Sequence, residues 1–441
     1  MSDERPRLEV YLTRSVLFQN EKPPESFGEG APSPQAKARL QRIKERLDAG
    51  YLTNLIQACQ MPAYMANPLE SRHAGLLSRL VDSVTSEVGR ALVGLTILQL
   101  CVKAIEPEQS VRLHKAGGVG SNFSWTEGIP MRVLDKNYIT PTLRHFDLLR
   151  LNLDGFMMTR SLAENYPYSN LYKAAIRGAR TEWMELVDLI ELGAVEPETA
   201  LRHLIGLLFN RSANFQRLAE NAILAVRACL HTFVGLEDAI RFIRTFVDNS
   251  PYSARVFEIA LHALFQVLAE QNVFGGVLKP LCQMRSANKK HGNIGDIEII
   301  KKAGGLEILE TWDAKYGKPY LREELDEVNE KLEDHSETEV VGFVVDSEPN
   351  RKAEIEERIR EIELLHGVKV YLQGFEEWVK SQVQRAIGAD TTALNKQWVL
   401  AFAESLCQLR RHLAPIDEPS DAWVTALIEH ANRWQLERRE T

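Results

Sequence analysis

The sequence predicts a mixed α+β protein, with a large α-helical N-terminal region followed by an α/β core that contains a mixed central sheet. Apolar residues recur at three- and four-residue spacings over much of the first 250 residues, as at Leu76, Leu77 and Leu80. That spacing is typical of helices that bury one face. After residue 250, short runs rich in Val and Ile, such as Glu339–Val345, alternate with helical segments. This alternation predicts a sheet that helices cover.

With 441 residues, the chain is long enough for two or three domains. A break at Asp248–Tyr252 is rich in turn-forming residues and lies between the two kinds of pattern. We therefore expect a mainly helical region at residues 1–250 and an α/β core at residues 251–390. Residues 391–441 are expected to form a C-terminal helical extension.

Composition excludes several classes of protein. The net charge of −8 argues against indiscriminate coating of nucleic acid or membranes, although it allows a local basic cleft. The five cysteines are far apart, which favours reduced thiols in a cytoplasmic protein and makes a zinc site improbable. The longest apolar run, Ala91–Val102, is too short to span a bilayer, so we expect no membrane association.

The helical region begins with less regular segments. Leu8–Leu12 predicts a strand, and the following residues 21–34, rich in Pro, Glu and Gly, predict a surface loop. Ser33 and Pro34 then begin a helix that runs to about Ala49 and ends at Gly50. Residues 68–105 read as one long helix or two, and helices are expected over most of residues 169–247.

An irregular stretch at residues 106–141 interrupts the helices. It includes a glycine-rich sequence that lacks the Gly-Lys-Ser/Thr ending of a phosphate-binding loop, so a nucleotide site is not predicted. Long irregular segments in compact proteins often carry function. Lys115, Asn122 and Trp125 are therefore candidates for contacts with a phosphate backbone or a base. The alternative is a plain loop between domains.

A predicted β-hairpin lies in the α/β core. Two apolar runs, Ile294–Ile300 and Leu306–Trp312, flank a short turn that contains Gly304 and Gly305. Folding this hairpin brings Asp296 opposite the segment that ends at Asp313. Lys315 lies two residues beyond Asp313, so strand alternation places both side chains on one face.

Two carboxylates and one lysine at the end of a strand have a chemical interpretation. Paired carboxylates provide the oxygen ligands that Mg²⁺ prefers, and Mg²⁺ also binds substrate phosphate oxygens. A neighbouring lysine can orient or help to deprotonate a metal-bound water and can neutralise charge on a phosphorane. The alternative is a surface hairpin with scattered charges.

Asp296 followed by Asp313-Ala-Lys315 resembles the active-site motif of the PD-(D/E)XK nuclease superfamily, in particular type II restriction endonucleases. Gly295 stands where the family usually has proline. The family core runs helix, three antiparallel strands, helix, strand. The segments of this chain that match that order cover about a third of it: a helix at 253–269, the hairpin, a helix at 320–332, a strand at 339–345, a helix at 351–365 and a strand at 368–372.

The resemblance implies a restriction-endonuclease-like core and roles for specific residues. Asp296, Asp313 and the Ala314 carbonyl would bind Mg²⁺, and Lys315 would position the attacking water. The products would carry a 5′-phosphate and a 3′-hydroxyl. Members of the superfamily often place an acidic residue of the first helix near the metal, which makes Glu258 an auxiliary ligand or a water-orienting group. A glutamate at the edge of that helix is the alternative.

A basic run leads directly to Asp296. Arg285, Lys289 and Lys290 are placed to bind DNA phosphates if a phosphodiester enters the site there, although a solvated loop also accounts for the run.

These observations predict a Mg²⁺-dependent, type II site-specific deoxyribonuclease acting on double-stranded DNA. Because one site cuts one strand, we expect a homodimer, with the helical region supplying recognition, dimerisation or both. A separately encoded DNA methyltransferase is a further partner that the resemblance implies. Repair and recombination nucleases of the superfamily are alternatives. A helical DNA-binding or regulatory protein with a degenerate nuclease-like domain is favoured if Asp296, Asp313 and Lys315 do not converge.

Overall fold

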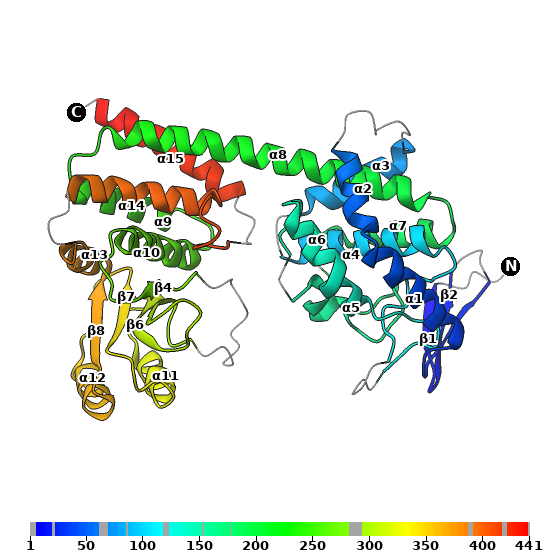
Figure 1. The fold of residues 1–441 in the computed structure, drawn as a ribbon, viewed down its shortest axis with the longest axis horizontal. Helices are drawn as coiled ribbons and strands as arrows, with labels where there is room; N and C mark the ends of the chain where they lie inside the picture. Colours follow the sequence, from blue (N-terminus) through cyan, green and yellow to red (C-terminus); the bar gives the residue numbers. More distant parts are fainter. Residues whose placement is uncertain are drawn as a thin grey trace. The chain divides into compact units, whose positions relative to one another are not determined.

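The protein is a mixed α+β chain that divides into two compact units after Asn214 (Figure 1). The computed structural model describes residues 6–19, 23–60, 69–84, 87–117, 123–151, 154–176, 178–281, 293–386, 391–416 and 421–439. The division differs from the expected boundary near residue 250. Residues 215–250 belong to the second unit, as do residues 391–441.

The first unit combines a small sheet with a helical body. Its three antiparallel strands lie in the order β1-β2-β3, and β1 confirms the strand predicted near Leu8. Ser33 accepts a hydrogen bond from the backbone N of Ala36 (3.0 Å), which caps the helix predicted at Pro34. In the described part of residues 69–105, the chain forms two helices, α3 and α4. The elements are β1 (Arg7–Val10), β2 (Arg14–Phe18), β3 (Glu25–Gly28), α1 (Pro34–Asp48), α2 (Tyr51–Cys59), α3 (Ser71–Asp82), α4 (Glu87–Ile105), α5 (Met131–Leu134), the π-helix Asp135–Ile139, α6 (Thr140–His145), the 3₁₀ turns η3 (Phe156–Met158) and η4 (Arg160–Leu162), α7 (Arg180–Glu191) and the start of α8 (Pro197–Leu230).

The second unit is built on a five-stranded mixed sheet. The strands are β4 (Val277–Leu278), β5 (Ile297–Ile300), β6 (Ile308–Lys315), β7 (Val340–Val345) and β8 (Lys369–Gly374), in that spatial order. The predicted hairpin is confirmed, because β5 and β6 pair antiparallel with Ile297 opposite Trp312. Strands β6, β7 and β8 run parallel to one another.

Side-chain alternation along these strands gives the sheet two buried faces. One face, including Ile297, Trp312 and Val344, joins the large core of α10, α13 and α14, whereas Val341, Phe343 and Val345 pack against α11 and α12 on the other. The helices of this unit are the end of α8, α9 (Leu236–Asp248), α10 (Ser253–Glu270), α11 (Arg322–Leu332), α12 (Ala353–His366), α13 (Phe375–Gln384), α14 (Thr391–Leu406) and α15 (Asp421–Arg439).

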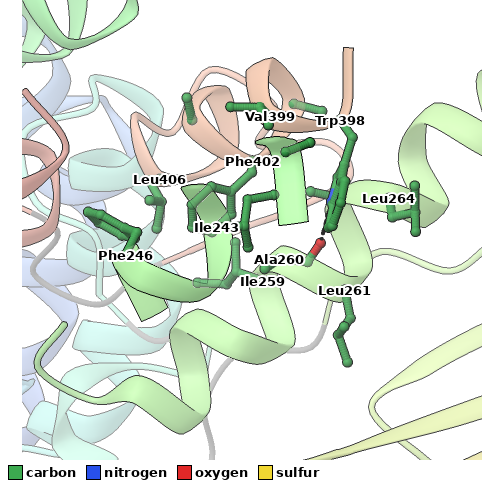
Figure 2. Packing of buried hydrophobic residues seen from close by; sticks show 14 of the residues in the cluster. Ile243, Phe246, Ile259, Ala260, Leu261, Leu264, Trp398, Val399, Phe402 and Leu406 are labelled. Carbon is green, nitrogen blue, oxygen red and sulfur yellow. Dashed lines mark hydrogen bonds between the residues drawn. The ribbon is translucent and has the colours of Figure 1, made fainter. Parts of the chain in front are cut away.

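Helix α10 lies at the centre of the large core. Figure 2 shows its side chains packed against those of α9 and α14. The indole N of Trp398 on α14 also donates a hydrogen bond to the Ala260 carbonyl (2.9 Å). The segment expected as a C-terminal extension therefore covers the helix that carries Glu258.

Among the helices that the structure describes, none combines the length and the apolar character needed to cross a bilayer.

Candidate active site

Asp296, Asp313 and Lys315 converge where β6 ends. Asp296 directly precedes β5, and its backbone N donates to the Trp312 carbonyl (3.1 Å). Its Oδ2 accepts a hydrogen bond from the backbone N of Ala314 (3.0 Å), which brings its carboxyl group across to β6. The Asp296 carboxylate lies close enough to Asp313 to raise its pKa by repulsion, and Lys315 Nζ lies 2.7 Å from Asp313 Oδ2. The arrangement expected from the hairpin is thus present.

The cluster lies at the carboxyl ends of the parallel strands. Asp313 pairs with Phe343 of β7 and Lys315 with Val345, so both side chains lie on the sheet face that α11 and α12 cover. Side-chain exposure is 17% for Asp313 and 21% for Lys315, which leaves part of each group accessible. Open sheets with parallel strands commonly bind ligands at this edge.

Close packing explains the glycine at position 295. A Cβ atom there would lie 2.6 Å from Thr311 Oγ1 and 3.0 Å from the Trp312 carbonyl oxygen. The first distance is shorter than real Cβ contacts and the second is tighter than most, so the approach of β6 disfavours proline and other side chains at this position. The glycine at this position therefore has a local steric cause.

The position of Asp313 is fixed by the residue before it. The Trp312 ring stacks on Tyr371 of β8, with 6.0 Å between centroids, and meets the Trp378 ring edge-on at 5.8 Å. The ring lies over the intervening β7 at Gly342, where no side chain stands in its way. Its indole N donates to Glu310 Oε1 (2.7 Å). A one-residue slip of β6 would break all of these contacts and turn Asp313 to the opposite face.

Burial and mutual repulsion perturb the charges in the cluster. Burial raises the pKa of Asp296, and the nearby Glu258 charge raises it further. Burial also raises the pKa of Asp313 well above its ordinary value, with repulsion from Asp296 adding to the effect. For Lys315, burial acts to lower the pKa, but attraction to Asp313 and Asp296 outweighs it and the pKa is raised. Lys315 is therefore an ammonium cation at neutral pH.

Glu258 lies beside this cluster on α10, close enough for its charge to act on Asp296. Its Oε1 is 2.6 Å from Arg255 Nη1, and the side chains of Glu258 and Arg255 are only 14% and 4% exposed. The pairing with a buried arginine was not anticipated from the sequence. The three-residue spacing of Arg255 and Glu258 on one helix face was the available signal.

The donor atoms present fit Mg²⁺. Within the described part of the chain, no three side chains of His, Cys, Asp and Glu form a group that could hold a metal ion. Mg²⁺ needs fewer protein ligands, since one or two carboxylates suffice when waters and substrate phosphate complete its shell. Asp296 and Asp313 provide such a carboxyl pair, with the Ala314 carbonyl as the third expected donor. Their raised pKa values also mark a place where a cation would relieve repulsion between carboxylates.

Arg285, Lys289, Lys290 and Asn122, four of the residues predicted to contact DNA, lie outside the described residues. Lys115 belongs to the first unit, where its Nζ donates to Asn165 Oδ1 (2.5 Å) and lies 5.8 Å from the Phe123 ring centroid. Burial lowers the pKa of Lys115.

Trp125 requires a correction. Its side chain is fully buried and packs edge-on against Phe27 and Phe123. Because the whole side chain is buried, neither face of the indole ring is accessible to a DNA base, and the expected contact with DNA is not possible in this structure. Trp125 is a core residue beneath the N-terminal sheet.

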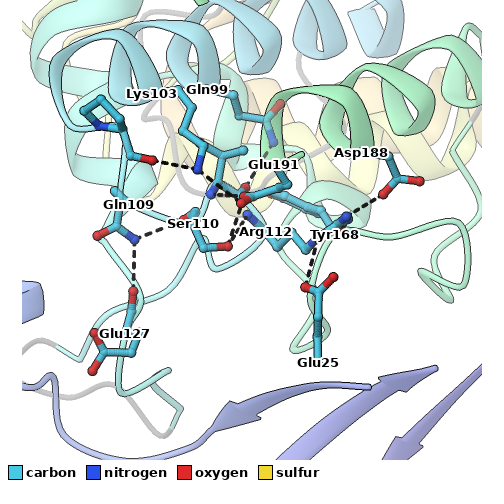
Figure 3. Close-up of polar contacts among 12 residues, drawn as sticks. Glu25, Gln99, Lys103, Gln109, Ser110, Arg112, Glu127, Tyr168, Asp188 and Glu191 are labelled. Carbon is cyan, nitrogen blue, oxygen red and sulfur yellow. Dashed lines mark hydrogen bonds and ion pairs between the residues drawn. The ribbon is translucent and has the colours of Figure 1, made fainter. Parts of the chain in front are cut away.

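The irregular segment around Arg112 is held by buried polar contacts (Figure 3). Arg112 is 1% exposed, pairs with Asp188 (2.5 Å) and donates to the Tyr168 carbonyl (2.7 Å). Glu191 accepts from Ser110 Oγ (3.0 Å) and pairs with Lys103. These contacts satisfy backbone and side-chain groups of a segment without regular structure, and they explain how it is ordered inside a compact unit.

No protein-family model matches the chain, and no curated protein is significantly similar to it in sequence. The chemistry of the cluster is therefore inferred from this chain's own residues and from their resemblance to the PD-(D/E)XK motif.

Proposed function

We propose that the protein is a Mg²⁺-dependent endonuclease that hydrolyses phosphodiester bonds of double-stranded DNA at a specific sequence, as type II restriction enzymes do. The observation that carries the proposal is the convergence of Asp296, Asp313 and Lys315 at the end of β6. The competing function, a helical DNA-binding or regulatory protein with a degenerate nuclease-like domain, would have been favoured if these groups lay apart.

Each residue of the cluster has a separate role in the proposed reaction. Asp296, Asp313 and the Ala314 carbonyl would hold Mg²⁺, which when bound stabilises negative charge on the scissile phosphate and the leaving oxygen. Lys315 carries a positive charge at neutral pH because its pKa is raised, so it acts as a hydrogen-bond donor rather than as a base. Held by Asp313, its ammonium group orients the attacking water and neutralises charge on the phosphate.

The distribution of charge restricts how DNA is held. The first unit contains 25 Lys and Arg against 24 Asp and Glu, whereas the second contains 28 against 37. The unit that carries the carboxyl cluster is therefore acidic overall, and its net field repels a polyanion. DNA binding then depends on local basic groups, on Mg²⁺ and on a second copy of the chain that acts on the other strand.

Incubation with DNA of mixed sequence tests the proposal. The wild type, Asp313→Asn, Lys315→Met and the control Lys318→Met are compared in Mg²⁺ and in EDTA. Lys318 is a suitable control because it lies three residues further along and pairs with Glu324 (2.8 Å). Discrete fragments, formed only in Mg²⁺ by the wild type and the control, support the proposal. Their ends should also ligate without treatment, as 5′-phosphate and 3′-hydroxyl ends do.

Other outcomes overturn part or all of the proposal. A smear of fragments indicates a nuclease without sequence specificity. Intact DNA that shifts on a gel indicates a DNA-binding protein. Cleavage by Asp313→Asn at the wild-type rate removes the cluster from the chemistry.

A further inference from the structure

The end of β6 is held mainly from one side. Pairing with β5 stops at Ile297 and Trp312, whereas pairing with β7 continues to Lys315 and Val345. From Asp313 onward, β7 is therefore the neighbouring strand of the sheet. Contacts that hold the end of β7 against β6 therefore also hold the backbone of Lys315 in place.

Asp346 extends this pairing beyond the last residues of the two strands. It follows Val345 directly, and its Oδ1 accepts a hydrogen bond from the backbone N of Gly317 (2.7 Å). Gly317 has a φ of +71°, so the chain turns sharply only two residues after Lys315. The Asp346 carboxylate thus closes the turn in which β6 ends.

Asp346 is itself fastened to α9. Arg244 Nη2 donates to the Asp346 carbonyl (3.3 Å), and Arg244 Nη1 pairs with Glu376 Oε1 (2.7 Å). The hydroxyl of Tyr316, which lies in the same turn, donates to Asp248 Oδ1 at the end of α9 (3.1 Å). Residues on both sides of the turn therefore attach to the same helix.

We propose that Asp346 is a positioning residue: by holding Gly317, it fixes the end of β6 and keeps the Lys315 ammonium group on Asp313. A lysine side chain has a flexible four-carbon stem, so a fixed backbone narrows the range of positions that its Nζ can reach. Glu324 of α11 also attracts Lys315 but already pairs with Lys318. Loss of the Asp346 contact allows the turn to open and Lys315 to leave Asp313 for solvent. The catalytic consequence rests on the proposed function, but the structural one does not.

Chemical labelling of the full-length protein tests this inference. Lysines are acylated under competitive conditions, and the rate at each lysine is read by mass spectrometry of peptides. Acylation is slow where Nζ is shielded in an ion pair and faster where it is free. Asp346→Ala should raise the rate at Lys315 several-fold relative to Lys318. Asp346→Asn keeps an acceptor oxygen for Gly317 N and should restore much of the protection.

Glu337→Ala is the matched control. Glu337 also accepts a hydrogen bond from a backbone N of β6, that of Ile308 (3.2 Å), but at the opposite end of the strand. It should leave the rate at Lys315 unchanged. A Lys315 rate in folded Asp346→Ala equal to that of the wild type overturns the inference, as does an equal increase in Glu337→Ala. If Asp346→Ala does not fold, Asp346→Asn provides the test. It should raise the acylation rate at Lys315 by a smaller amount, whereas Glu337→Ala should leave that rate unchanged.

Cleavage assays on the same variants separate this inference from the proposed function. Positioning predicts that Asp346→Ala lowers kcat with little change in the Kd for DNA, and that Asp346→Asn recovers part of the loss. A wild type that never cuts DNA, combined with the expected labelling, removes the nuclease function and leaves Asp346 as the residue that positions Lys315. A wild type that cuts, combined with unchanged labelling, removes the positioning role alone.

Discussion

The indole ring of Trp312 lies so close over Gly342 that a Cβ atom on Gly342 would sit 2.0 Å from a ring carbon. The two residues are direct neighbours on β6 and β7, and Trp312 also immediately precedes Asp313. The absence of a side chain on one strand therefore sets the position of an acidic group on the next.

Gly342→Ala should destabilise the second unit by about 3 kcal/mol or more, because the added methyl group forces the Trp312 ring out of its packed position. Gly275→Ala is the control, since a Cβ atom there meets nothing within 4 Å. Thermal unfolding of both variants checks the prediction. Equal melting temperatures for Gly342→Ala and the wild type would show that the ring relaxes without cost.

Asp313→Ala and Lys315→Met should each lower the rate of DNA cleavage by at least about 100-fold while leaving DNA affinity nearly intact. The chemistry depends on these groups, whereas affinity comes from phosphate and base contacts elsewhere. Without Mg²⁺, Asp313→Ala should bind DNA more tightly than the wild type because a carboxylate near the phosphate is gone. Single-turnover cleavage and gel-shift titration measure the two quantities. A parallel loss of affinity and rate would instead indicate a binding role.

Asp313→Asn should stabilise the metal-free protein at neutral pH by about 1 kcal/mol. The raised pKa of Asp313 means that the folded state favours the protonated group, so its contribution to stability is lost as pH rises through the folded pKa. A neutral amide removes that loss, so the gain should be larger at pH 8 than at pH 5. Denaturant unfolding at the two pH values, with EDTA present, gives the comparison. If the gain in stability is the same at both pH values, it arises from packing and not from the charge of Asp313.

Glu258→Gln should raise the Mg²⁺ concentration needed for cleavage and reduce the increase in melting temperature on adding Mg²⁺. It should also destabilise the unit by about 3 kcal/mol, because Arg255 loses a buried charged partner at 2.6 Å. The double variant Arg255→Met/Glu258→Gln recovers stability if the pair accounts for that cost. Unchanged metal dependence in Glu258→Gln would give Glu258 a structural role only.

Asp135 should titrate near pH 6. Its side chain is fully buried in the first unit, and burial raises its pKa to about 6, although it accepts hydrogen bonds from Thr140 Oγ1 (2.6 Å) and Met157 N (2.9 Å). The raised pKa contributes about 3 kcal/mol of stability below pH 4, which is lost as pH rises through 6. Asp135→Asn should flatten that pH dependence.

The pH dependence must be followed in the unfolding transition of the first unit, and Gly155→Ala shows which transition that is. A Cβ atom at Gly155 would lie 2.4 Å from Asp135 Oδ2, and the φ of +97° disfavours any side chain. The transition that this substitution lowers is that of the first unit. If its midpoint shows the same pH dependence in Asp135→Asn as in the wild type, another group is responsible.

The hairpin and its charged residues were predictable because the information is local. Two apolar runs around a glycine turn define the pairing, and the two-residue spacing of Asp313 and Lys315 defines their common face. The strand β4 was missed because a strand of two residues is too short to show the alternation of apolar and polar side chains that marks a strand in a sequence. The burial of Trp125 was missed because Phe27, one of its packing partners, lies about a hundred residues away in sequence.

The expected boundary and the division after Asn214 differ for another reason. Asp248–Tyr252 is a real turn, in which Tyr252 adopts a left-handed conformation before α10. However, α9 packs back onto α10 and α14 across that turn. The division after Asn214 falls inside the unbroken helix α8, where no proline or glycine marks it.

The central position of α10 makes the large core of the second unit depend on segments that lie far apart in sequence. Helix α10 is buried by α14, which begins about 120 residues after α10 ends. While the chain emerges from the ribosome, Asp313 and Lys315 appear well before the residues that cover the large core. Contacts between segments so far apart in sequence form slowly. We therefore expect the hairpin that carries Asp313 and Lys315 to pair early, whereas the core around α10 is complete only after α14 has been synthesised.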